Sequence, residues 1–306
     1  MTPVYLETAR LMTRVAPWVF ADGAFALKGG TAINLFVRDL PRLSVDLDLV
    51  LIDHRLDRSA ALATIDTALR DAAQRLAQRG LDVHTARTDG ADSTKLFVRQ
   101  GRVEVKVEVN GVLRGTVHPV RVMSLTARAR DILAADVALP VVSSADLYGG
   151  KLVAALDRQH PRDLFDVMEL YRNEGLTPEV RRAFVVYLAS HNRPIHEVLA
   201  PTPRDIDLKY RSGFSGMTAE PVDLEDLLVT RERLIGDLRI GLDADERAFL
   251  LSIAQCAPEW SRLDIEHLHE LPALRWKLEN LRRLARTNPV KFRDQSDRLE
   301  QLLGSG

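Results

Sequence analysis

The sequence predicts an α/β (α+β) fold in two parts, a mixed-sheet domain over residues 1–142 and a helical domain over residues 143–306. Up to residue 142, short apolar or alternating segments are separated by turn residues and interleaved with helical patterns, as in a sheet with helices packed on it. From residue 143 onward the helical period dominates. A chain of 306 residues lies in the range where two domains are common.

The first part begins with a helical pattern over 22 residues, interrupted at Pro17, and an Asp22-Gly23 turn. A strand at 25–27 then leads into a glycine turn and a helix that extends to Asp39. A third helix is expected at 58–79, and the remaining strands at 43–50, 81–85, 94–99, 102–109, 118–123 and 138–142. Gln100-Gly101 separates two of these strands and predicts a hairpin.

The second part begins with a helix-start signature over Ser143 to Asp146. Prolines 194, 201 and 203 predict a loop between its third and fourth helices. The expected helices of this part cover 145–158, 161–174, 177–191, 222–238, 243–255 and 271–301.

Composition excludes several classes of protein. The hydrophobic fraction is 46% and the charged fraction 28%, as in ordinary globular proteins. A single cysteine, Cys256, excludes an intramolecular disulfide framework, and we find no signal peptide or membrane-spanning stretch, so a cytoplasmic protein is expected. Because the net charge is −1, nucleic acid binding would require a local basic patch.

Asp46 and Asp48 are the first candidates for a functional site. They are two residues apart on a predicted strand, so their carboxylates project from one face. Two adjacent carboxylates repel unless a cation lies between them, and oxygen ligands of this kind suit Mg²⁺ or Mn²⁺. The alternative is that Asp-x-Asp is the polar face of an edge strand.

Gly29, Gly30 and Thr31 lie between a strand and a helix, where glycine allows the backbone to approach a phosphate and the helix N-terminus offers N–H groups. Thr31 adds a hydroxyl contact or caps its helix. Ser44, two residues before Asp46, is a further candidate for nucleotide binding, or else an ordinary serine at a strand entry. The combination of the glycine turn with Asp-x-Asp on the next strand predicts a phosphate and metal site.

A third carboxylate is expected from the alternating strand near residue 106. Two-metal phosphoryl transfer commonly uses such a ligand, and Glu108 or Glu104 could supply it. Lys106 lies between the two glutamates, which favours the alternative of an exposed face with compensating charges.

Three charged residues of the helical part complete the set. Lys151 lies in a strongly apolar helix, from which its ammonium group can reach a triphosphate. Asp163 and Asp166 follow on the next helix, three residues apart on one face. Asp163 lies at the helix start, where an aspartate is often a dipole partner, so Asp166 is the stronger catalytic candidate.

The order of these motifs resembles the AbiEii/AbiGii-type nucleotidyltransferase toxins of the DNA polymerase β-like superfamily. The matching stretches are GGTAINLF, LSVDLDL, VKVEVN, DLYGGKLVAALDR, PRDLFDVMEL and LPALRWKLENL, from about residue 25 to about 281. The resemblance implies that Gly29, Gly30 and Thr31 hold phosphate and that Asp46 and Asp48 bind metal. It also implies that the helical domain contributes Lys151, Asp163 and Asp166 to the site, whereas Glu108 is the least secure metal ligand.

The resemblance further implies a toxin with a cognate antitoxin encoded by a neighbouring gene. Such an enzyme would transfer NMP from an NTP to RNA, at the 3′ end of tRNA, and so block translation. Two other functions stay open, modification of a protein hydroxyl and a non-catalytic nucleotide-binding module.

The segment from Leu274 to Arg298 is a candidate RNA contact, because it carries eight basic residues against three acidic ones. The equally weighted alternative is a solvated helix face that balances an acidic body.

Overall fold

The computed structural model describes residues 3–87 and 93–304. Packing divides the chain into two units, the first made of residues 1–147 and 214–221, the second of residues 148–213 and 222–306. The sequence placed the division after residue 142. In the structure it falls within helix α5 (Ser144–Arg158), and a short segment beyond residue 213 returns to the first unit.

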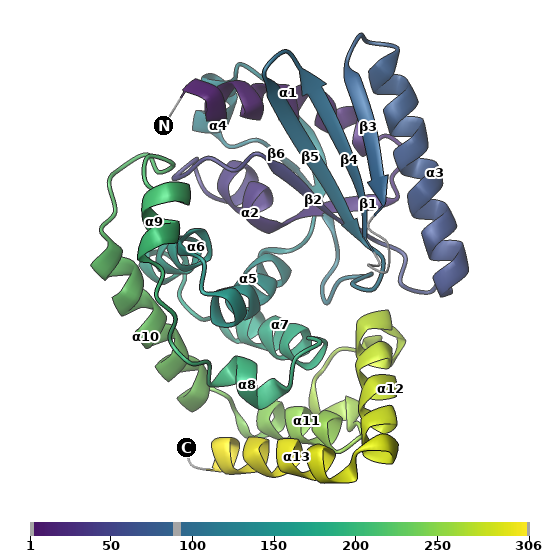
Figure 1. Cartoon of the computed structure of the whole chain (residues 1–306), viewed down its shortest axis with the longest axis vertical. Coiled ribbons are helices and arrows are strands. Elements are labelled where there is room, and N and C mark those ends of the chain that lie inside the picture. Colours follow the sequence, from purple (N-terminus) through teal and green to yellow (C-terminus); the bar gives the residue numbers. More distant parts are fainter. Residues whose placement is uncertain (1–2, 88–92, 305–306) are drawn as a thin grey trace. The chain divides into compact units, whose positions relative to one another are not determined.

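Unit 1 is built on a mixed sheet with the strand order β3-β4-β5-β2-β1-β7-β6 (Figure 1). The pairs β2/β5 and β1/β7 are parallel, and the other neighbours are antiparallel. The strands are β1 (Phe25–Lys28), β2 (Asp46–Leu51), β3 (Asp82–Arg87), β4 (Ser93–Gln100), β5 (Val103–Asn110), β6 (Arg121–Ser124) and β7 (Ala138–Val141).

Two long helices of unit 1, α1 (Pro3–Val19) and α3 (Arg58–Ala77), contact the sheet, α1 at β5 and α3 at β3 and β4. The alternation of β5 buries Val105, Val107 and Val109 and leaves the charged residues between them on the other face. The helices of this unit are α1 (Pro3–Val19), α2 (Gly29–Ala32), a π-helix (Ile33–Val37), α3 (Arg58–Ala77) and α4 (Ala127–Leu133).

All regular secondary structure among the described residues of unit 2 is helical. Besides the larger part of α5 it contains α6 (Pro161–Arg172), α7 (Pro178–Ala189), α8 (Ile195–Leu199), α9 (Asp207–Gly213), α10 (Leu224–Ile240), α11 (Ala244–Ala254), α12 (Pro272–Thr287) and α13 (Pro289–Gly304), with short 3₁₀ turns at Trp260–Arg262 and Leu268–Glu270.

The α/β fold class is confirmed, as is the β4/β5 hairpin. The predicted helix at 271–301 is wrong, because the chain turns at Asn288 and Pro289 begins a new helix, α13, drawn in yellow in Figure 1. The helices α4, α8 and α9 were not predicted, and α1 continues through Pro17 to Val19.

The strand predicted at 43–50 begins at Asp46 instead. The preceding residues pair elsewhere in unit 1: Leu43 N donates to Met217 O at 3.0 Å, and Ala219 N donates to Pro41 O at 2.7 Å. Arg42 forms an antiparallel bridge with Thr218. The strand predicted at 118–123 likewise begins later, at Arg121, beyond Pro119.

Among the described helices, we find none with the length and apolar character that crossing a bilayer would require.

Candidate functional site

The glycine turn closes on Asp48 within unit 1. Gly29 has a φ of 75°, and a Cβ atom built on it would lie 2.5 Å from Asp48 Oδ2. A side chain at residue 29 would therefore be strained by the backbone and blocked by the carboxylate. The sequence predicted that these two motifs would meet at one end of the sheet, and the structure brings them into contact.

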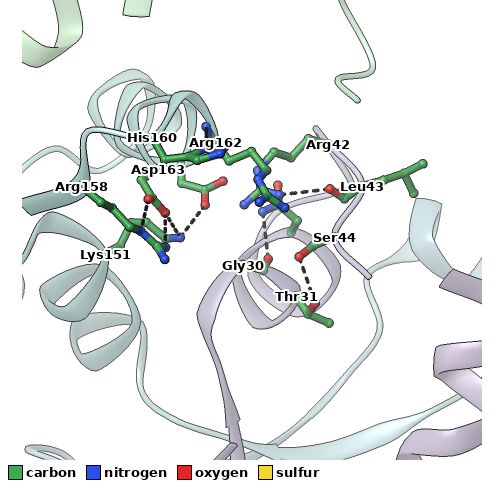
Figure 2. A network of polar contacts seen from close by, with 12 residues as sticks. Gly30, Thr31, Arg42, Leu43, Ser44, Lys151, Arg158, His160, Arg162 and Asp163 are labelled. Atoms are coloured by element: carbon green, nitrogen blue, oxygen red, sulfur yellow. Dashed lines mark hydrogen bonds and ion pairs between the residues drawn. The ribbon is translucent and has the colours of Figure 1, made fainter. Parts of the chain in front are cut away.

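Thr31 and Ser44 connect the turn to the beginning of β2 (Figure 2). The Thr31 hydroxyl donates to the Asp46 carbonyl oxygen at 2.5 Å and lies 3.0 Å from Ser44 Oγ. Thr31 is buried, whereas Ser44 is half-buried. Thr31 thus holds the strand that carries the aspartates, which is a positioning role, and direct contact of Thr31 or Ser44 with a nucleotide stays a prediction.

Sequence reasoning missed Arg42, whose side chain is 2% exposed. A Cβ atom on Gly30 would lie 2.7 Å from an Arg42 guanidinium nitrogen and 3.0 Å from Ser44 Oγ. Gly30 therefore makes room for a buried cation beside the turn (Figure 2). The signal available in the sequence was an arginine four residues before Asp46, where the apolar neighbours predicted burial.

Carboxylates and lysines alternate on the charged face of β2 and β5. Asp46 is in register with Lys106, and Asp48 with Glu108. On the other side of β2, Lys28 of β1 is in register with Asp48. The sheet therefore collects three half-buried carboxylates on one face, as the sequence predicted.

Lysines bind the third carboxylate. Glu108 lies 3.1 Å from Lys106 Nζ and 3.7 Å from Lys95 Nζ. Burial alone would lower the pKa of Lys106, but Asp46, Glu108 and Asp48 outweigh it and hold this pKa above its usual value. The contacts of Glu108 match the alternative of compensating charges, and its role as a metal ligand stays a prediction.

The candidate ligands for a magnesium ion are the carboxylates on this face of the sheet. In residues 3–87 and 93–304, no three His, Cys, Asp or Glu side chains are arranged to hold a metal ion. Asp46 and Asp48 nevertheless provide two oxygen ligands on one strand face, and Lys106 of the neighbouring strand is in register with Asp46. The donor set fits a cation that takes few carboxylates and completes its shell with water and phosphate oxygens.

Unit 2 contains a buried ionic cluster between α5 and α6. Lys151 Nζ lies 2.8 Å from Asp163 Oδ1 and 3.0 Å from Asp166 Oδ2, and these three side chains are 6%, 2% and 1% exposed. Arg158 binds Asp163 with two nitrogens, at 2.6 and 3.0 Å (Figure 2). The structure thus joins the three residues of the helical part that the sequence singled out, and it adds Arg158.

The electrostatics of this cluster keep Asp163 ionised. Burial alone would raise the pKa of Asp163, but Lys151 and Arg158 outweigh it and hold this pKa well below its usual range. Asp163 is therefore an anion bound by two cations, which suits a positioning role. Asp166 contacts Lys151 from one turn further along α6.

His160 caps α6 and was also missed. Its Nδ1 accepts a hydrogen bond from Arg162 N at 3.2 Å, which requires this nitrogen to be unprotonated. Burial, assisted by Arg162, lowers the pKa of His160 to about 4. The neutral imidazole thus fixes the helix turn that begins with Pro161 and carries Asp163.

Comparison with known proteins gives the same assignment as the motifs. The family described as "Nucleotidyl transferase AbiEii toxin, Type IV TA system" matches residues 10–280. Among solved structures, MenT4, a nucleotidyltransferase toxin from Mycobacterium tuberculosis H37Rv, is similar with a TM-score of 0.58 at 19% identity, covering 90% of this chain and 94% of that chain. This second likeness shows a shared fold. Curated proteins include no sequence that matches the chain. Because the family match extends over most of the sequence, the chain belongs to the AbiEii family of nucleotidyltransferase toxins of type IV toxin–antitoxin systems.

Proposed function

We propose that this enzyme transfers NMP from an NTP to an RNA hydroxyl, at the 3′ end of tRNA, and thereby blocks translation. The contact between the Gly29 turn and Asp48 carries the proposal, because the N–H groups of the turn can donate to phosphate and the neighbouring carboxylate can hold a metal ion. Pyrophosphate is the leaving group: the acceptor oxygen bonds to the α-phosphorus as the bond to the β-phosphate oxygen breaks.

Residues of unit 1 bind the phosphates. The first turn after Gly29 has N–H groups without intrahelical partners, and these donate to phosphate oxygens. Asp46 and Asp48 would hold Mg²⁺ or Mn²⁺, which when bound neutralises the triphosphate and the departing pyrophosphate. Thr31 and Arg42 keep the turn and the strand in place.

Residues of unit 2 provide charge and a proton acceptor. The ammonium group of Lys151 interacts with the triphosphate. Asp163 and Asp166 orient this ammonium group. Arg158 balances Asp163, so the cluster contains two cations and two anions. Asp166 is the residue of this cluster proposed to accept the proton of the attacking hydroxyl.

Label transfer tests the proposal. The chain is incubated with each α-³²P-labelled NTP, Mg²⁺ or Mn²⁺, and either total RNA or cell lysate. We expect label in the tRNA fraction, with a decrease of about a hundredfold or more for Asp48→Asn. The matched control is Asp82→Asn, which removes an exposed carboxylate at the start of β3 and should leave transfer unchanged.

Each other outcome identifies a different function. Label in protein instead of RNA would mean that the acceptor is a protein hydroxyl. No transfer with any NTP would mean a nucleotide-binding module, and equal transfer by Asp48→Asn would overturn the metal assignment.

The proposal includes the setting of a toxin. We expect a cytoplasmic enzyme whose growth inhibition is relieved by an antitoxin encoded by a neighbouring gene. Co-expression of that gene with the toxin, compared with the toxin alone, tests this expectation by growth.

A further inference from the structure

Exposed basic residues gather on one side of α12 and at the beginning of α13. The four arginines of α12 fall within an arc of about 100° around the helix axis. The opposite side of this helix is buried and includes Leu274 and Leu278. We call the exposed set the α12 arginine face; its members are Arg275, Arg282, Arg283, Arg286, Lys291 and Arg293.

The structure removes two residues that the sequence had grouped with this set. Lys277 is 6% exposed, and its Nζ donates to the carbonyl oxygens of His191 and Arg193, both at 2.7 Å. Arg298 is ion-paired with Asp294 at 3.0 Å. Neither contributes free positive charge to the surface.

The six members of the α12 arginine face differ from most exposed arginines of unit 2, because none forms an ion pair with a described carboxylate. Arg275 donates to a backbone carbonyl, and Arg283 to the side-chain amide of Asn280. Glu279, on the same side of α12, has no ion pair within the described residues. Elsewhere in the unit, most exposed arginines are paired, as in Arg172–Glu169, Arg211–Asp207 and Arg233–Asp237.

We propose that the α12 arginine face binds the phosphate backbone of the acceptor RNA, which rests on the proposed function. Six cations without carboxylate partners on a protein of net charge −1 form a local site for a polyanion. Arginine suits phosphate because its planar guanidinium donates two parallel hydrogen bonds. Trp276, which is 47% exposed at the edge of the face, offers a surface on which an unpaired base stacks.

A protein partner fits this face less well. Stable protein interfaces have an apolar centre surrounded by a polar rim. Here the centre consists of arginines and Glu279, and the exposed apolar side chains, Trp276 and Val290, lie at its edges. RNA is therefore the occupant that the charge pattern favours.

Binding of fluorescein-labelled total tRNA, measured by anisotropy without NTP at several salt concentrations, tests the proposal. Arg282→Gln with Arg286→Gln should raise Kd on the order of ten- to thirtyfold at 0.15 M salt and reduce the slope of log K against log salt by about 1.4–1.8, the loss of two phosphate contacts. Arg282→Lys with Arg286→Lys keeps both charges and should restore most of the slope.

The control is the double variant Arg172→Gln with Arg211→Gln, which removes the same charge from two ion-paired arginines and should change Kd by less than about threefold. Circular dichroism melting verifies that each variant is folded. A Kd and slope of the Arg282/Arg286 variant equal to those of this control would overturn the inference, and so would unchanged tRNA binding with loss of binding to the neighbouring gene's product.

Failure of the proposed function gives a different result. If wild type labels no RNA but the α12 variants still lose tRNA binding, the catalytic assignment fails and the RNA surface stands. If the proposed function and the RNA surface are both correct, the α12 variants raise the tRNA concentration for half-maximal labelling. They leave the NTP concentration for half-maximal labelling unchanged.

Discussion

At the scale of single residues, the candidate site depends on two glycines whose lack of a side chain leaves room for charged neighbours. Gly29 and Gly30 have no Cβ, and the space is taken by Asp48 and by the Arg42 guanidinium. A glycine turn of this kind cannot be replaced without moving a charged side chain. Its two constraints, the positive φ and the contact with Asp48, can be separated by comparison with another glycine.

Gly29→Ala should lower label transfer by at least tenfold, because its Cβ would push the Asp48 carboxylate away. Gly80→Ala is the matched control. Gly80 has a φ of 76°, close to the 75° of Gly29, but a Cβ there would have no atom within 4 Å. Both variants incur about 1–2 kcal/mol of left-handed strain and should lower Tm, and Gly29→Ala should lower it further because its Cβ also displaces Asp48. Equal transfer rates for the two variants would contradict the role of the Gly29–Asp48 contact.

Asp163→Asn should destabilise the fold by about 3–5 kcal/mol, since removal of one charge from a buried cluster leaves Lys151 without full compensation. Urea unfolding measures the change. Arg158→Gln serves as comparison, because Arg158 is 60% exposed and its charge is accessible to water. A smaller loss for Asp163→Asn than for Arg158→Gln would show that the cluster is not held by Asp163.

At the scale of elements, alternation made the central strands predictable. The valines of β5 and the charges between them indicated which face is buried, and the β4/β5 hairpin followed from Gln100-Gly101. Short helices were not predictable in the same way, because α8 and α9 have five and seven residues, too few for a clear apolar period. The π-helix at Ile33–Val37 has the same apolar residues as an ordinary helix.

The cap of α6 should make stability depend on pH. The pKa of His160 is about 4 in the folded chain and near 6.5 when unfolded, so the unfolded chain binds more protons between these values. The stability contributed by the neutral cap is present above pH 6.5 and is lost as pH falls toward 4. His191 and His196 have lowered pKa values and act in the same direction, so the measurement must isolate His160.

His160→Asn provides that isolation, since asparagine also caps a helix and does not titrate. We expect the free energy of unfolding in urea to decrease less for the variant than for wild type between pH 7 and pH 5. Parallel curves would show that His160 does not titrate on unfolding.

Lys277 should make stability rise with pH as well, but in a higher range of pH. Burial lowers its pKa to about 8, against about 10.4 when unfolded, so the unfolded chain binds more protons between these values. The buried ammonium costs stability below pH 8, and this cost disappears as pH rises toward 10. The difference in unfolding free energy between wild type and Lys277→Met should therefore shift in favour of wild type from pH 7.5 to pH 10. A difference independent of pH would contradict the assignment.

At the scale of the whole molecule, the family and the fold class were predictable from motif order, because each motif is local. The grouping of Lys151 with Asp163 and Asp166 was predictable in the same way, whereas Arg42 and Arg158 were missed. The return of residues 214–221 to unit 1 was not predictable. Thr218 forms a β-bridge with Arg42 across more than 170 residues of sequence. The spacing of apolar residues within a single element cannot predict a pairing between segments so far apart.

This return predicts that a core mutation late in the sequence weakens the first unit. Phe214 is 1% exposed and belongs to unit 1, so Phe214→Ala should cost about 3–5 kcal/mol there. Leu208→Ala, six residues earlier at 77% exposure in α9, is the control and should cost less than about 0.5 kcal/mol.

Because a chain of two units need not unfold in one step, hydrogen exchange measured separately for each unit is the appropriate readout. Phe214→Ala should reduce amide protection in β1 and β2 while α11 and α13 keep theirs, whereas loss confined to unit 2 would mean that the segment stabilises the helical unit instead.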